Sequence, residues 1–405
     1  MAKPRQKSLF EQLRDSMRDA IETSIASLNA YGSQYDYWCI SYSGGKDSSA
    51  TVSFVRWAIK NGFVKAPKKL YVLYSDTRQE LTPLWTTAER FIKELREEGV
   101  DARMVAPVID DRFYVYMFGR GVPPPSNTFR WCTPQLKIEP IEAALAQVRE
   151  ETGQKFLQLT GVRMGESAAR DARIAISCSS KDGECGQGWF QARPSTHVAD
   201  TLAPLLHWRQ CYVWDWLYDA WTDKYVQRVL GFPEAKGHGY DYLGDIAVAY
   251  GNDEGRTGCI GCNLASRDVA LENIIKNPEW SHLAPLMGIK PLFKELKQAK
   301  NHLRKAEPEL KKDGNFGKNG QRLGPLTMEA RAYGLERILD IQRRASVDLI
   351  NADEEARIRQ MWADGIYPHG WEGGFDNPNH VRGDVALDAI TVVGDSELIV
   401  QPMLL

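Results

Sequence analysis

The order of apolar patterns along the chain constrains its fold more than any other feature. Short β-prone runs cover residues 37–42, 69–75, 102–108 and 155–160, and helical spacing of apolar residues covers 50–59, 82–98 and 138–151 between them. Strands that alternate with helices of this length are joined by right-handed crossovers and run parallel. We therefore predict an α/β fold with an open, mostly parallel twisted sheet flanked by helices.

The chain changes character after this alternating region. Residues 167–201 are rich in Ser, Gly, Arg and Cys with little periodicity, which is typical of a long loop or insertion. Helices are expected at 213–229 and 268–275, and two more begin near Thr327 and, with a capping box, at Asn351. We expect four parts: an N-terminal helix in 1–35, a domain in 36–230 that contains the insertion, a segment in 231–290, and a mainly helical C-terminal region in 291–405.

Composition excludes several classes of protein. The chain has 405 residues with 51 Lys and Arg against 53 Asp and Glu, so its formal charge of -2 excludes an overall basic nucleic-acid coat. It shows neither an export signal nor a run of about 18 apolar residues, and we expect a cytoplasmic protein without membrane contact. Its seven cysteines favour reduced thiols over a disulfide framework.

A glycine-rich loop follows the first predicted strand. The hexapeptide Ser43-Gly44-Gly45-Lys46-Asp47-Ser48 lacks the G-x-x-x-x-G-K-S/T spacing of a Walker loop. Its glycines let backbone N–H groups approach phosphate oxygens, its serines add hydroxyls, and Lys46 adds a positive charge at a helix N-terminus. The alternative is an ordinary strand-to-helix turn. Ligands of parallel sheets bind at the carboxyl ends of the strands, so Asp76 and Gly161 to Arg163 should converge with this loop.

This loop is similar to the PP-loop of ATP pyrophosphatases, enzymes that cleave ATP between the α and β phosphates. Further segments narrow the resemblance to the adenylyl-sulfate and phosphoadenylyl-sulfate reductase branch of the superfamily, of adenine nucleotide α-hydrolase-like fold. Between about Trp38 and Trp362 the chain looks most like the sulfurtransferase of Dnd-type DNA phosphorothioation systems. The segments that carry this resemblance are Arg130-Trp131-Cys132-Thr133, Lys137-Ile138-Glu139-Pro140, Gly161-Val162-Arg163, 204–217, 256–262 and Gly324-Pro325-Leu326-Thr327.

The resemblance implies an ATP site with catalytic side chains. Lys46, Asp47 and Arg163 are expected to be catalytic, and Asp47 with Asp76 could hold Mg²⁺ through hard oxygen ligands. Asp47 could instead only cap its helix, and Arg163 and Arg170 could be ion-paired rather than clamp a phosphate. The residues expected to bind ATP are Ser43, Gly44, Gly45, Lys46, Asp47, Ser48, Asp76, Gly161 and Arg163.

The cysteines are candidates for a metal centre. Cys259 and Cys262 form a C-x-x-C pair among glycines, and soft thiolates suit an iron–sulfur cluster or zinc. The resemblance to iron–sulfur reductases adds Cys132 as a ligand. Cys185 is the expected fourth ligand, with Cys178 as its alternative. A 4Fe-4S cluster is expected, and zinc or a redox dithiol is the alternative; Cys39 and Cys211 are expected to be core residues.

The resemblance also implies the reaction and the partners. We expect an ATP-dependent sulfurtransferase that adenylates DNA backbone phosphate, receives sulfur from a cysteine desulfurase, and works with DNA or a DNA-bound modification complex. Nine Lys and Arg against four Asp and Glu in residues 294–322 could contact DNA, although a solvated face is the alternative. The alternative functions are a sulfonucleotide reductase, whose E-C-G-L-H type segment is absent, and a non-catalytic nucleotide-binding subunit of a defence complex.

Overall fold

The chain divides into two compact units, each built from separate stretches of sequence. The computed structural model describes residues 9–165, 183–184, 189–192, 198–251, 257–304, 314–315, 323–368, 371, 390–393 and 397–400. The first unit comprises Met1–Ser75, Thr82–Val105 and Pro140–Val248. The second comprises Asp76–Leu81, Ala106–Glu139 and Ala249–Leu405. Residues far apart in the sequence therefore share one core in each unit.

A seven-stranded sheet forms the centre of the first unit, in the order β3-β2-β1-β4-β7-β6-β5. The neighbouring strands β3, β2, β1, β4 and β7 pair in parallel, and β6 and β5 add an antiparallel edge. The predicted α/β fold with an open, mostly parallel sheet is confirmed. The strands are β1 Tyr37–Tyr42, β2 Lys69–Ser75, β3 Asp101–Val105, β4 Phe156–Leu159, β5 Gly183–Glu184, β6 Trp189–Gln191 and β7 Ala199–Ala203.

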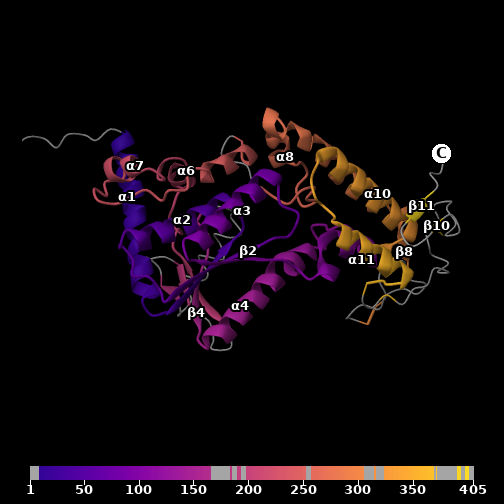
Figure 1. Ribbon diagram of the computed structural model, residues 1–405, viewed down its shortest axis with the longest axis horizontal. Coiled ribbons are helices and arrows are strands. Elements are labelled where there is room, and N and C mark those ends of the chain that lie inside the picture. The colour runs from indigo at the N-terminus through magenta and orange to yellow at the C-terminus, as the bar shows by residue number, and fades with distance from the viewer. Residues whose placement is uncertain are drawn as a thin grey trace, which may run out of the picture. The chain divides into compact units, whose positions relative to one another are not determined.

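Helices cover this sheet on both sides. In Figure 1, α4 lies on one side, and α2 and α3 lie on the other. Ala144, Leu145 and Val148 of α4 pack on a strand face that includes Cys39, so the predicted core position of this thiol is confirmed. The helices are α1 Leu9–Ser27, α2 Lys46–Lys60, α3 Thr82–Glu97, α4 Glu139–Thr152, α6 Gln210–Asp219 and α7 Asp223–Arg228.

Four details differ from the sequence-based expectation. Strand β3 ends at Val105 rather than 108, because Pro107 cannot donate to a ladder. Strands β5 and β6 and the start of β7 lie where an irregular insertion was expected. A single helix was expected at 213–229, but two helices form there. α6 ends at Asp219, and Thr222 caps the start of α7. Cys211, expected in the core, is exposed, because it lies on the outer side of α6 while Tyr212 and Val213 face inward.

The second unit is mainly helical, as predicted for the C-terminal region. Thr327 caps α10 by accepting a hydrogen bond from the Ala330 N–H, and the predicted capping box of Asn351 and Glu354 begins α11. Two short antiparallel pairs, β8 with β9 and β10 with β11, accompany the helices. The elements are α8 Val269–Ile274, α9 Ile289–Leu296, α10 Met328–Ala345, α11 Ala352–Ala363, β8 His302–Arg304, β9 Leu323–Leu326, β10 Ile390–Val393 and β11 Glu397–Val400.

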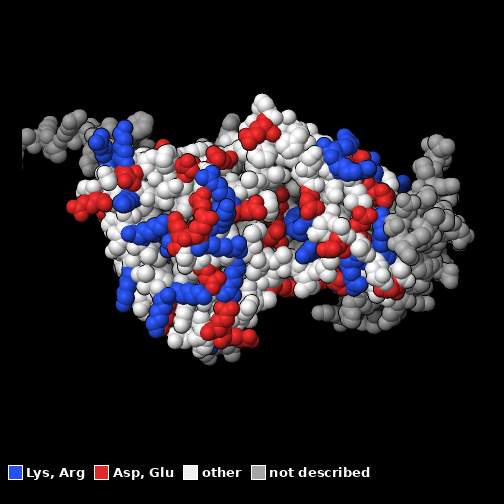
Figure 2. Space-filling view, in the orientation of Figure 1, with Lys and Arg blue, Asp and Glu red and all other residues white. Residues whose placement is uncertain are grey.

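Two further expectations concern the surface. On the face drawn in Figure 2, basic and acidic side chains are interspersed, which agrees with the near balance of charges in the sequence. Of the helices that the structure describes, none is long and apolar enough to cross a membrane. The balance of charges means that any strongly basic surface in the described regions must be local.

Candidate functional site

The phosphate loop joins β1 to α2 in the first unit. Gly44 has a φ of +73°, a left-handed conformation that suits glycine, and a Cβ at this position would lie 3.4 Å from Ala88. Gly45 is the N-cap of α2, and no side chain caps the helix there. The first N–H groups of a helix have no intrahelical partners, so this end of α2 offers donors to an anion.

The two serines of the loop have different environments. Ser48 is buried, and its Oγ accepts a hydrogen bond from the Ser43 N–H at 3.2 Å and donates one to the Gly45 carbonyl at 3.0 Å. The hydroxyls of Ser43 and Ser48 lie 3.1 Å apart, and Ser43 itself is exposed. Ser48 thus shapes the loop from inside, whereas Ser43 is the hydroxyl that solvent or a ligand can reach.

Two cations share one carboxylate at the start of α2. The Lys46 Nζ lies 3.2 Å from Oδ2 of Asp47, and the Nε of Arg163 donates to Oδ1 of the same residue. Arg163 is only 3% exposed and also donates from Nη1 to the Trp208 carbonyl at 3.0 Å. Arg163 is therefore ion-paired, one of the alternatives left open by the sequence. The three charges sum to +1, which favours binding of a polyphosphate.

Gly161 explains why β4 approaches the loop so closely. A Cβ at this position would lie 3.0 Å from both the Asp47 carbonyl carbon and the Ser48 nitrogen. The chain just after β4 therefore packs directly on the loop backbone, which a Cβ at Gly161 would displace by a few tenths of an ångström. The predicted convergence of 43–48 with Gly161 and Arg163 is observed within this unit. Asp76 belongs to the second unit, and its role as a Mg²⁺ ligand stays a prediction.

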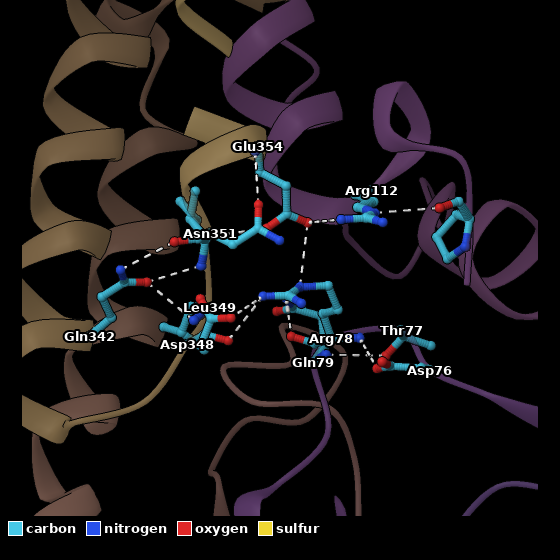
Figure 3. A network of polar contacts seen from close by, with 12 residues as sticks. Asp76, Thr77, Arg78, Gln79, Arg112, Gln342, Asp348, Leu349, Asn351 and Glu354 are labelled. Carbon is cyan, nitrogen blue, oxygen red and sulfur yellow. Dashed lines mark hydrogen bonds and ion pairs between the residues drawn. The ribbon is translucent and has the colours of Figure 1, made fainter. Parts of the chain in front are cut away.

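The segment Asp76–Leu81 is held to the helices of the second unit by a polar network (Figure 3). Arg78 has a φ of +55° and contacts Oδ2 of Asp348 at 2.8 Å and Oε1 of Glu354 at 3.3 Å. Arg112 reaches the same Glu354 oxygen at 3.2 Å, and the Arg78 N–H donates to Oδ1 of Asp76 at 2.9 Å. The network fixes the backbone on both sides of Arg78.

Three cysteines line one cavity of about 220 Å³ in the second unit. Cys132, Cys259 and Cys262 are each partly buried, and apolar side chains such as Phe113 and Phe293 close the cavity. The structure thus brings Cys132 to the C-x-x-C pair across more than a hundred residues of sequence. Among the described residues, no three His, Cys, Asp or Glu side chains lie close enough together to hold a single metal ion.

Backbone contacts shape the loop that carries the C-x-x-C pair. The Ile260 N–H donates to the Gln79 carbonyl at 2.8 Å, and the Gly261 N–H donates to Oδ2 of Asp268 at 3.2 Å. Gly261 has a φ of +65°, and a Cβ there would lie 2.4 Å from the Ile289 side chain. Gly258, by contrast, has only the Cys262 Cβ near it, at 3.7 Å. The two glycines permit the tight turn and leave space beside the sulfurs.

Lys137 and Glu80 complete the electrostatics of the cavity, and sequence reasoning gave neither a role. Burial raises the pKa of the Cys259 thiol to about 11, with the Lys137 ammonium opposing this effect. The negative charge of Cys259 raises the pKa of Lys137 in turn, and the two side chains hydrogen-bond. Burial raises the pKa of Glu80, although the Thr77 hydroxyl donates to it at 2.6 Å. Lys137 belongs to the segment Lys137-Ile138-Glu139-Pro140 and could have been noticed there, whereas no sequence pattern around Glu80 points to the cavity.

Burial also raises the pKa of Cys132, and the negative charge of the nearby Cys262 thiolate raises it further. Thiols with raised pKa values stay protonated at neutral pH, so binding of a metal must release protons. The donor set nevertheless fits a thiolate-bound iron–sulfur cluster, because three soft sulfurs face one cavity beside a compensating cation. The expected fourth ligand, Cys185, its alternative Cys178, and Arg170 lie outside the described residues.

Residues 38–224 match the family model of the phosphoadenosine phosphosulfate reductase domain. The matched residues include the phosphate loop, Gly161 and Arg163. An uncharacterised protein of Methanocaldococcus jannaschii is 25% identical over 220 residues, which are 52% of this chain and 45% of that protein. The chain thus spans less than half the length of this curated relative.

Two solved structures resemble the chain at 12% identity. Phosphoadenylyl-sulfate reductase from Candida auris, in a phosphate complex, aligns with a TM-score of 0.31 over 52% of this chain and 86% of its own. The U34-tRNA thiolase NcsA from Methanococcus maripaludis, with its 4Fe-4S cluster, aligns with a TM-score of 0.32 over 70% of this chain and 83% of its own. Neither alignment bears on the chemistry of this chain.

Proposed function

We propose that this protein is an ATP-dependent sulfurtransferase that adenylates a backbone phosphate of DNA and replaces one of its oxygens with sulfur. The observation that carries the proposal is the loop of residues 43–48, with its glycine turn and uncapped helix end, and with a charge of +1 when Arg163 is counted with Lys46 and Asp47. The loop lacks the Walker spacing and resembles the PP-loop of ATP pyrophosphatases, and that resemblance implies cleavage between the α and β phosphates.

The reaction would have two displacement steps. A non-bridging oxygen of the acceptor phosphate forms a bond to the α phosphorus of ATP, and the bond from that phosphorus to the bridging oxygen breaks, so that pyrophosphate leaves. Hydrosulfide, formed when a thiol reductant cleaves the persulfide of a cysteine desulfurase, then forms a bond to the acceptor phosphorus. The bond from that phosphorus to the oxygen shared with AMP breaks, so that AMP leaves with this oxygen and the hydrosulfide proton is lost to solvent. Adenylation is required because an unmodified phosphate oxygen is a poor leaving group.

The residues of the loop would bind and stabilise the departing pyrophosphate. Lys46 and the N–H groups at the start of α2 offset the charge that develops on it, and Ser43 adds a hydroxyl donor. Asp47 would orient Lys46 and Arg163, which it contacts. Mg²⁺ that accompanies ATP would suit the Asp47 carboxylate as a hard oxygen ligand.

An iron–sulfur cluster on Cys132, Cys259 and Cys262 would hold or relay sulfur when bound. A zinc ion would require its sulfur ligands within about 4 Å of one another, given Zn–S bonds of about 2.3 Å in a tetrahedron. A cluster spreads its cysteines over several iron atoms, so it suits thiols that share a cavity without forming a single-ion group in the described regions. Lys137 would offset the negative charge of the thiolates.

The test follows the products of ATP labelled at the α phosphate, with an oligonucleotide acceptor and a cysteine desulfurase. We expect AMP and pyrophosphate, and Lys46→Ala should slow AMP formation by about 100-fold, the cost of a lost charge-stabilising donor. Lys65→Ala is the matched control, because Lys65 is exposed in the same unit. Formation of ADP and phosphate would contradict the proposal, and unchanged function of Lys46→Ala would favour a non-catalytic subunit.

The domain match of residues 38–224 also favours a second candidate, a reductase of adenylyl sulfate or phosphoadenylyl sulfate. Such an enzyme would release sulfite from a labelled sulfonucleotide with thioredoxin as reductant, without consuming ATP. Sulfite release at rates above those of AMP formation would select the reductase over the sulfurtransferase.

A further inference from the structure

A second pocket of about 500 Å³ lies in the same unit as the three cysteines. Basic side chains dominate it, and apolar atoms of Leu286, Met287 and Pro291 form part of its wall. The basic residues that line it are Arg267, Lys290, Lys294 and Lys297. This concentration of positive charge is unusual in a chain whose overall charge is -2.

The amphipathic pattern of α9 places three of these lysines on one side. Lys290, Lys294 and Lys297 are spaced by four and three residues, so they share one face of the helix and of its last turn. The other face carries the buried residues Ile289, Leu292, Phe293 and Leu296. Burial of that apolar face forces the lysines to face the pocket.

Both acidic residues of the pocket already have hydrogen-bond or ion-pair partners, and the charge of Lys290 acts on Glu272 only at longer range. Asp268 accepts hydrogen bonds from the N–H groups of Leu271 and Gly261, and Glu272 is paired with Arg267. Of the described residues, none accepts a hydrogen bond from the Lys290 ammonium, which has almost no exposed surface. A shielded and unpaired cation costs free energy, and an anion in the pocket would recover it.

The pocket adjoins the cysteine cavity. Asn263 lines both, and the charge of Cys262 acts on Lys297, whose Nζ donates to the Pro125 carbonyl at 2.6 Å. An extended anionic ligand held by Lys290 and Lys294 would thus have its neighbouring groups close to the thiols.

We propose that this pocket binds the phosphodiester backbone of the nucleic-acid strand that carries the acceptor phosphate. The inference rests on the proposed function, and it adds the place where the acceptor is held. Its binding residues are Lys294, which is exposed, and Lys290, whose shielded ammonium lacks an acceptor among the described residues and would turn toward the bound phosphate. The shared chemistry is a single-stranded polyphosphate backbone, which either DNA or RNA could supply.

Fluorescence anisotropy with labelled single-stranded 12-mers of DNA and of RNA tests the proposal at several salt concentrations. For the variant Lys290→Glu with Lys294→Glu, we expect the Kd to rise by about 10-fold or more. The milder variant, Lys290→Gln with Lys294→Gln, should reduce the slope of log Kd against log salt by about 1.4, since each single-strand phosphate contact contributes about 0.7. Circular dichroism and thermal melting check that both variants fold.

The matched control is Lys300→Glu with Arg337→Glu, which makes the same charge change at exposed positions of the same unit that do not line the pocket. Its Kd should change by less than about twofold. The polymer that binds more tightly identifies the acceptor as DNA or RNA.

Equal weakening by the control, or binding of tripolyphosphate but of neither 12-mer, would overturn the proposal. Binding needs no ATP, so these results stand even if the protein forms no AMP and the proposed function fails.

Discussion

The phosphate loop and the cysteine cavity are built in different ways. The loop is one continuous hexapeptide, and its geometry follows from a glycine turn and the start of α2. The cavity draws Cys132 from one stretch of the chain and Cys259 and Cys262 from another. One site is therefore specified by local backbone conformation, whereas the other exists only when the second unit has folded.

The two sites also differ in their charges. At the loop, Asp47 neutralises one of two cations and leaves a net positive site for an anion. At the cavity, Lys137 is the cation that faces thiols whose pKa values are raised by burial. The loop is thus prepared to receive charge, while the cavity must lose protons before it can hold a metal. A substitution that disrupts one site should therefore leave the other intact.

The largest effect should come from removal of a cavity thiol. Cys259→Ser or Cys132→Ser should lose nearly all bound iron, and with it the visible absorption of anaerobically purified protein, while AMP formation persists. Cys211→Ser is the matched control, since Cys211 is exposed and does not line the cavity. Full iron content in Cys132→Ser would exclude it from the centre, and stoichiometric zinc in colourless protein would replace the cluster with a zinc site.

The converse effect should follow a change beneath the phosphate loop. Gly161→Val should lower AMP formation by about 10-fold or more, because its side chain would displace the backbone at Asp47 and Ser48. Gly161→Ala should have a smaller effect of the same sign. Iron content should stay at the wild-type level in both. Equal activity of Gly161→Val and wild type would show that the loop does not need this support.

A smaller effect is expected from the network in Figure 3. Arg78→Ala should lower the free energy of unfolding by about 1–2 kcal/mol, since it removes ion pairs to Asp348 and the buried Glu354. Arg78→Gly should lose less, because glycine adopts the left-handed backbone at no steric cost. Arg343→Ala, at an exposed ion pair in α10, should change stability by less than about 0.5 kcal/mol in denaturant titrations. A greater loss in the glycine variant would contradict this account.

A further effect concerns the pH dependence of stability in the first unit. Burial lowers the pKa of His238 from 6.5 to about 4. The Tyr240 N–H donates to Nδ1 of this ring at 3.1 Å, and the Trp216 carbonyl lies 3.0 Å from Nε2, so the folded state holds the neutral imidazole. Below pH 6.5 the unfolded chain binds a proton that the folded chain does not, and stability falls progressively down to pH 4.

Denaturant titrations between pH 7.5 and 5 check this prediction. His238→Asn retains an acceptor near the Nδ1 position but does not titrate, so the slope of its stability against pH should be smaller than that of the wild type. An unchanged slope would assign the acid sensitivity to other groups.

The sequence predicted the sheet better than it predicted the edges of the elements. Residues 37–42 and 69–75 alternate with amphipathic helices, and both strands form with the predicted limits. The strand at Ala199–Ala203 was missed because its short pattern adjoins a region without periodicity. Cys211 was placed in the core from its aromatic neighbours, yet neighbours in a helix point to different sides.

By itself, the sequence determined the alternating α/β fold, the glycine loop and the two capped helices that begin at Thr327 and Asn351. These features depend on residues within a few positions of one another, so local pattern suffices to specify them. Only the tertiary structure decided that Arg163 pairs with Asp47, that Lys137 faces Cys259, and that Lys290 is shielded without a partner among the described residues. Such contacts join distant segments, and they form only because burial of apolar faces fixes where those segments lie.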